Sequence, residues 1–197
     1  EPFALAAHHA DAAACFRAQA VDERRHALFF DRVAERVARV PGATPAARRR
    51  AARSRLNPSF LELFDERLPA TANRLAVGDG GLEDAVGLYH MLLEGIVFSA
   101  GVTTLLELLE DHGAAFPGLQ RGVGLILRDE RWHIGFGARL LADLGVDEPA
   151  TARLLEEGRR AASGWGDAVP RDVTARTLAL HRRRLLSARS SSIGAAA

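Results

Sequence analysis

Asp22-Glu23-Arg24-Arg25-His26 and Asp129-Glu130-Arg131-Trp132-His133 are two copies of one pattern, Asp-Glu-x-x-His. Each copy lies in a stretch whose apolar residues recur with helical spacing. Glutamate and histidine three positions apart differ by about 60° around a helix axis, so both side chains project from one face. Two such helices that face each other, with glutamates from neighbouring helices, can hold two transition metals. The repeated pattern therefore predicts an all-α, four-helix di-metal bundle.

The doubling makes a chance match a poor explanation. Composition alone gives about 0.5 matches to Glu-x-x-His in this chain. Both copies also carry Asp before Glu, and two such placements by accident are on the order of a 1% event. The alternative is a pair of solvated, charged helix faces. We favour the metal site.

Length and composition indicate one helical domain. The 197 residues are 48% hydrophobic, with Leu and Ala dominant, which favours helices. We expect the domain to span residues 1–188 and a disordered, Ser- and Ala-rich tail to span residues 189–197. A net charge of +1 makes no case for a nucleic acid or a membrane as partner.

The single cysteine, Cys15, leaves no internal disulfide, which suits a reducing cytoplasm. The sequence contains no recognisable signal peptide, and we expect no apolar run long enough to cross a bilayer.

Apolar spacing, with Pro and Gly as breaks, places the expected helices. They are residues 11–40, 45–56, 59–75, 82–111, 119–144, 148–162 and 171–187. Pro69 is expected to bend or break the third of them. Among the histidines without a Glu partner, His90 is expected to be a partly buried core residue. His8, His9, His112 and His181 are expected at the surface.

Glu94 lies in the middle of the apolar residues 89–98. A buried carboxylate costs several kcal/mol unless it binds a cation or a partner, so we expect a metal ligand, with an Arg-paired structural Glu as the alternative. Five of six expected ligands are then present: Glu23, His26, Glu94, Glu130 and His133. The segment before Asp11 is too short to place Glu1 at the same height along the bundle axis as Glu23. We therefore expect the chain to begin inside a truncated first bundle helix, with the sixth ligand, a carboxylate, upstream of residue 1.

Three elements taken together resemble the ribonucleotide reductase small-subunit family. They are Gln19-Ala20-Val21-Asp22-Glu23-x-x-His26-x-x-Phe29-Phe30, Tyr89-His90-x-x-x-Glu94-Gly95 and Arg128-Asp129-Glu130-x-x-His133-Ile134-Gly135-Phe136-Gly137. The resemblance covers about residues 1–145 and implies a ferritin-like bundle with extra helices.

Two residues resemble the ligand-binding Mn/Fe oxidase branch of that family. Phe30, on the helix face of Glu23 and His26, stands where the radical-forming reductases place Tyr. Tyr89 stands where that branch forms an ether crosslink to a valine. On a regular helix Tyr89 and Glu94 differ by about 140°, so joint access to the site requires a local bulge.

The resemblance implies an oxygen-activating oxidoreductase with Mn and Fe, or two Fe, as cofactors. It would use dioxygen for a two-electron oxidation of Tyr89 or of a hydrophobic ligand such as a long-chain carboxylate, in a channel lined by Phe30, Val97 and Phe98. A homodimer is expected. A metal-bound His usually donates its other ring nitrogen to a carboxylate. Related di-iron bundles pair these groups across helices, which assigns Asp129 to His26 and Asp22 to His133.

Three other functions stay open. A class I ribonucleotide reductase small subunit typically ends in a Tyr on a flexible tail, and residues 188–197 contain neither Tyr nor Trp. A di-iron oxygenase would act on a diffusible substrate, and the arylamine-oxidising members carry an added His that we do not find. A bundle that only stores metal would bind iron without consuming dioxygen in proportion.

Overall fold

The computed structural model describes residues 2–112 and 115–195, with side chains described as far as Ser190. This part of the chain is all-α, 85% helical and without strands. Its α-helices are α1 (Pro2–Ala6), α2 (Ala10–Arg36), α3 (Pro45–Arg53), α4 (Pro58–Glu62), α5 (Leu68–Ala76), α6 (Leu82–Val86), α7 (Ser99–Asp111), α8 (Pro117–Asp143), α9 (Glu148–Ala162) and α10 (Arg171–Ala195). The π-helical segments η1 (Leu63–Arg67) and η2 (Gly87–Phe98) join α4 to α5 and α6 to α7, and a 3-10 segment, η4 (Ser163–Ala168), follows α9.

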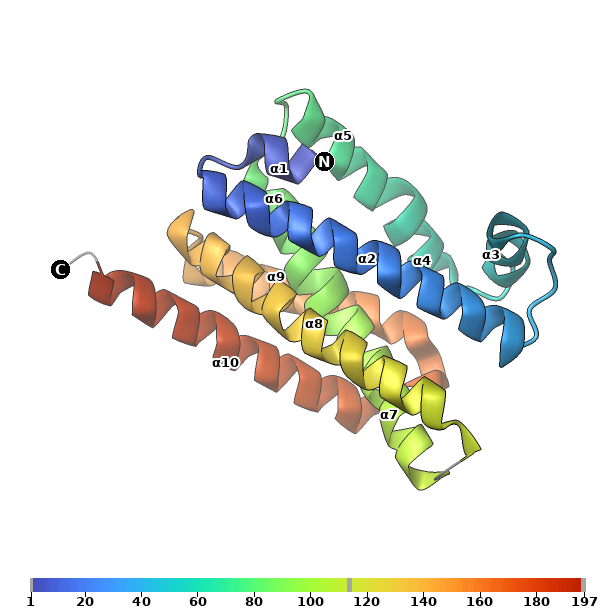
Figure 1. Ribbon diagram of the computed structural model, residues 1–197. Helices are drawn as coiled ribbons and strands as arrows, with labels where there is room; N and C mark the ends of the chain where they lie inside the picture. Colours follow the sequence, from blue (N-terminus) through green and yellow to red (C-terminus); the bar gives the residue numbers. More distant parts are fainter. Residues whose placement is uncertain (1, 113–114, 196–197) are drawn as a thin grey trace.

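The segment η2 is the centre of the packing. Helices α2, α8 and α10 lie side by side, with α8 between the other two (Figure 1). Helices α8, α9 and α10 all pack on η2. Its side chains Met91, Leu92 and Ile96 are at most 1% exposed. Burial of this segment on several sides explains why its sequence is almost entirely apolar.

The continuous helix from α6 to α7 corrects one expectation. Residues Leu82–Asp111 are long and apolar enough to cross a membrane, judged by length and composition alone. Half of the most apolar window is buried inside the protein. The segment η2, at the middle of this helix, packs on α8, α9 and α10.

Several helix ends differ from the predicted ones. Helix α2 stops at Arg36 because the N–H groups of Ala38 and Val40 return to earlier carbonyls and Arg39 takes a positive φ of 52°. Helix α10 continues as far as Ala195, through most of the tail that we expected to be disordered. The sequence of this segment is rich in Ala and Ser and has no proline that would end the helix. Residues 196 and 197 lie outside the described part.

Pro69 does not break its helix. The N–H of Leu68 returns five residues to the carbonyl of Leu63, which closes the π-helical turn η1. Pro69 follows as the second residue of α5. The wider turn accommodates the proline ring, which a regular helix interior would not.

The predicted bulge between Tyr89 and Glu94 is confirmed, because both residues lie in the π-helical segment η2 and line one cavity. Two side chains donate hydrogen bonds to backbone carbonyls near the end of η2. The Ser99 hydroxyl donates to the Glu94 carbonyl at 2.7 Å, and the Trp165 indole donates to the Val97 carbonyl at 2.9 Å. These bonds stabilise the return from π-helical to α-helical geometry.

His181 corrects another expectation, because it is 0% exposed rather than at the surface. Its imidazole, on α10, lies directly over Gly95 of η2. A Cβ at Gly95 would lie 2.5 Å from the ring carbon Cε1 of His181. Glycine is therefore required beside Glu94 for α10 to approach η2 this closely. His8, His9 and His112 are exposed as predicted, and His90 is only 1% exposed.

We expect Gly95→Ala to destabilise the fold by about 1–3 kcal/mol, because the new methyl group overpacks the contact with His181. Denaturant unfolding of both proteins measures the loss. Gly135→Ala on α8 is the matched control, since a Cβ there meets nothing within 4 Å. The double variant Gly95→Ala/His181→Ala should recover part of the loss, and no recovery would contradict this explanation.

Candidate metal site

The five predicted ligands come together between α2, η2 and α8. Helix α2 supplies Glu23 and His26, η2 supplies Glu94, and α8 supplies Glu130 and His133. One ligand atom from each of Glu23, Glu94, Glu130 and His133 lies within 4.8 Å of the others. The three-residue spacing of Glu and His works as predicted, since both side chains of each pair face this cluster.

The two histidines present the same ring nitrogen to the cluster. Nδ1 of His26 lies 3.2 Å from Glu130 and 3.6 Å from Glu23. Nδ1 of His133 lies 3.4 Å from Glu23 and 3.7 Å from both Glu94 and Glu130. Glu23 and Glu130 are thus shared between the histidines, whereas Glu94 is near His133 alone in these contacts.

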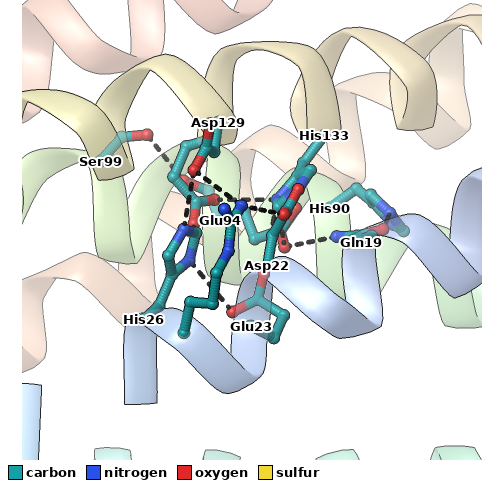
Figure 2. Close-up of polar contacts among 11 residues, drawn as sticks. Gln19, Asp22, Glu23, His26, His90, Glu94, Ser99, Asp129 and His133 are labelled. Carbon is teal, nitrogen blue, oxygen red and sulfur yellow. Dashed lines mark hydrogen bonds and ion pairs between the residues drawn. The ribbon is translucent and has the colours of Figure 1, made fainter. Parts of the chain in front are cut away.

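The expected pairing between helices is confirmed. Nε2 of His26 lies 3.3 Å from Asp129, and Nε2 of His133 lies 3.2 Å from Asp22 (Figure 2). A carboxylate accepts hydrogen bonds only, so each Nε2 donates and carries the proton. That tautomer leaves the Nδ1 lone pairs facing the glutamates, as a metal ligand requires.

Arg25 is a contributor that the sequence analysis missed. Its guanidinium bonds to Asp22 and lies 3.6 Å from Asp129, so one cation bridges both aspartates. The corresponding position in the second copy is Trp132, whose ring packs edge-on against His133 at a centroid distance of 4.4 Å. Arg25 is largely exposed, and no spacing rule distinguished it from the other arginines.

The cluster fits a cation. Five of its atoms are buried without a hydrogen-bond partner among the described residues: Glu23 Oε1, His26 Nδ1, Glu94 Oε2, Glu130 Oε2 and His133 Nδ1. Native proteins rarely leave buried polar atoms unpaired, and carboxylate oxygens and unprotonated Nδ1 atoms are all acceptors, so they cannot satisfy each other without a proton or a metal ion. A mixed set of carboxylate and imidazole ligands suits divalent manganese and iron.

Without a metal, protons balance the charges. Burial would lower the pKa of both histidines, but contacts with Glu130 and Glu23 raise the pKa of His26 to about 10 and that of His133 to about 12. Burial would raise the pKa of Glu23, but the close approach of His133 and His26 lowers it to about 2. Burial raises the pKa of Glu94 to about 8. A metal must displace these protons in order to bind.

An apolar cavity of about 390 Å³ opens onto the cluster. It reaches Glu23, His26, Glu94 and Glu130, and its apolar wall includes Phe30, Phe60, Phe64, Leu93, Val97, Phe98 and Trp165. The three predicted channel residues are therefore among its lining. Tyr89 also lies on this wall, and burial together with the charges of Glu94 and Glu23 raises the pKa of its hydroxyl, which stays protonated.

No family model, curated protein or solved structure matches the chain. The chemistry of the site is therefore argued from its own geometry. The predicted sixth ligand, upstream of residue 1, stays a prediction.

We expect the metal-free protein to lose stability as the pH rises from about 7.5 to about 9.5, by on the order of 1 kcal/mol per pH unit. The folded-state pKa values of His26, His133 and Glu94 all lie above their ordinary values. Their contribution is thus complete at low pH and falls as the pH rises toward those values. Thermal unfolding with a chelator measures the slope. With Mn(II) bound the slope should flatten or reverse, and a metal-free protein that gains stability over this range would contradict the prediction.

We expect Asp129→Ala to weaken metal binding by about 10- to 100-fold, because His26 loses the acceptor that fixes its tautomer. Metal titration followed by calorimetry measures the change, and the variant should stay folded. Asp111→Ala, at the exposed end of α7, is the control. Unchanged affinity in Asp129→Ala would show that the contact does not support the ligand.

Proposed function

We propose that this chain is a ferritin-like di-metal carboxylate oxidase, similar to ribonucleotide reductase small subunits and nearest to their Mn/Fe ligand-binding branch. It would hold Mn and Fe, or two Fe, between α2, η2 and α8. The convergence of Glu23, Glu94, Glu130 and His133, each with one ligand atom within 4.8 Å of the others, carries the proposal, and Nδ1 of His26 lies beside them at 3.2 Å from Glu130.

The contacts of the five residues would define two metal positions, one at each histidine. Glu23 and Glu130 each lie near both histidines, so they can serve two ions at once. Glu94 adds a carboxylate on the side of His133. The described residues thus give the position at His133 three carboxylates and the position at His26 two. We expect the position at His133 to bind the first ion more tightly.

The oxidation would take place at the inner end of the apolar cavity. Two reduced ions would supply two electrons and the binding place for dioxygen, and the oxidised group would supply the other two, which balances reduction of dioxygen to water. The cavity is lined mainly by apolar side chains and would hold an apolar chain with its polar end toward the glutamates. Tyr89, a protonated phenol on the same wall, would be the group of the chain that is oxidised.

The function is tested by loading the protein with Mn(II) and Fe(II) without oxygen, measuring metal per chain by mass spectrometry, and then admitting air. We expect up to two ions per chain, uptake of dioxygen in proportion to the metal, and a mass change in the peptide containing Tyr89 or in a co-purified apolar ligand. Metal without uptake of dioxygen would indicate a storage or binding protein. No stoichiometric metal would refute the site itself.

Single histidine variants separate the two positions. We expect His133→Ala to abolish the tighter binding step, whereas His26→Ala should keep one ion, because three carboxylates and His133 remain. Native mass spectrometry during a Mn(II) titration counts the ions. His112→Ala, an exposed histidine at the end of α7, is the control. Equal losses in both variants would contradict the inequality of the two positions.

A further inference from the structure

Gln19, on α2, connects the cluster to a buried histidine that lies outside it. Its Nε2 donates to Oε1 of Glu94 at 2.7 Å, and its Oε1 lies 2.8 Å from Nε2 of His90. All three side chains are buried, with Gln19 only 4% exposed. The contacts join α2 to η2 across 75 and 71 residues of sequence (Figure 2).

When Glu94 is ionised, as a metal ligand must be, the order of donors and acceptors along this line is fixed. An ionised carboxylate can only accept, so Gln19 must turn its NH2 group to Glu94. Its carbonyl then faces His90, and Nε2 of His90 must donate. Each group therefore determines the orientation of the next, and the amide cannot rotate by 180° without placing two acceptors or two donors together.

His90 is a buried, neutral imidazole that can donate a hydrogen bond to Gln19. It is 1% exposed, and the rings of Phe16 and Phe136 lie 5.8 Å and 5.9 Å from its own. A Cβ at Gly137 would lie 2.4 Å from the Cβ of His90, so α8 leaves room for this side chain. Burial lowers the pKa of His90 to about 3, which keeps the imidazole neutral.

We propose that Gln19, held by His90, is a positioning residue that fixes the carboxylate of Glu94 for metal binding. The inference rests on the proposed function. Gln19 engages Oε1 of Glu94, which also lies 3.7 Å from Nδ1 of His133, whereas Oε2 is buried without a hydrogen bond among the described residues, so the carboxylate keeps lone pairs for a cation. A carboxylate held at one oxygen loses little rotational freedom when the other binds a metal.

The test uses Co(II), which takes the same oxygen and nitrogen ligands and has a visible spectrum sensitive to their geometry. We expect Gln19→Leu to bind Co(II) about 10-fold or more weakly, with a changed spectrum. His90→Leu should move both readouts in the same direction, because Gln19 loses its anchor. His90→Gln should recover much of the wild-type behaviour, since its amide N–H can donate to Gln19. Gln120→Leu, the same change near the start of α8, is the matched control.

A folded Gln19→Leu variant with wild-type affinity and spectrum would overturn the inference while leaving the metal site intact. If Gln19→Leu does not fold, the two His90 variants decide, and equal behaviour of His90→Leu and His90→Gln overturns the role of the anchor. A wild-type protein that binds no Co(II) would refute the proposed function and the inference with it. Loss of thermal stability without a spectral change would show a purely structural role.

Discussion

The burial of two carboxylates and two imidazoles inside a helical core, with the half-buried Glu23 beside them, is the constraint on which the rest of the structure depends. Such groups cost several kcal/mol each to remove from water unless every charge is compensated. Neighbouring side chains supply part of that compensation through hydrogen bonds and ion pairs. Asp22 and Asp129 accept from the histidines, Arg25 bridges the two aspartates, and Gln19 donates to Glu94. The ligand atoms that these contacts leave without a hydrogen bond face the centre of the cluster.

The backbone is adapted to the same constraint. Glu94 and Tyr89 can share one cavity only because η2 winds more widely than an α-helix. A π-helical segment is less stable than an α-helix and commonly marks a functional site. Here it is held from outside by Trp165 and Ser99 and by the close approach of His181 to Gly95. Three elements that carry no ligand therefore determine where Glu94 lies.

The long helices and the five ligands could be predicted from sequence because both depend on local spacing. The 3.6-residue repeat fixes a helix face, and Glu-x-x-His fixes two side chains on it. Contacts between distant segments produce no comparable pattern in the sequence. The burial of His181, the bridge made by Arg25 and the bond from Gln19 to Glu94 depend on how helices pack. Helix ends at Arg36 and beyond residue 188 depended on weak local preferences, which tertiary contacts and single φ values override.

The cross-paired histidines also bear on how the protein is made. His26 finds its aspartate 103 residues later, and His133 finds its own 111 residues earlier. A ribosome releases α2 long before α8, at about 5–20 residues per second. Before α8 is made, the emerging chain contains Glu23, His26 and Glu94 but lacks Glu130 and His133. If the proposed function holds, the complete set of five ligands exists only after α8 has been made, so the ion would be selected by a folded cluster rather than by α2 alone.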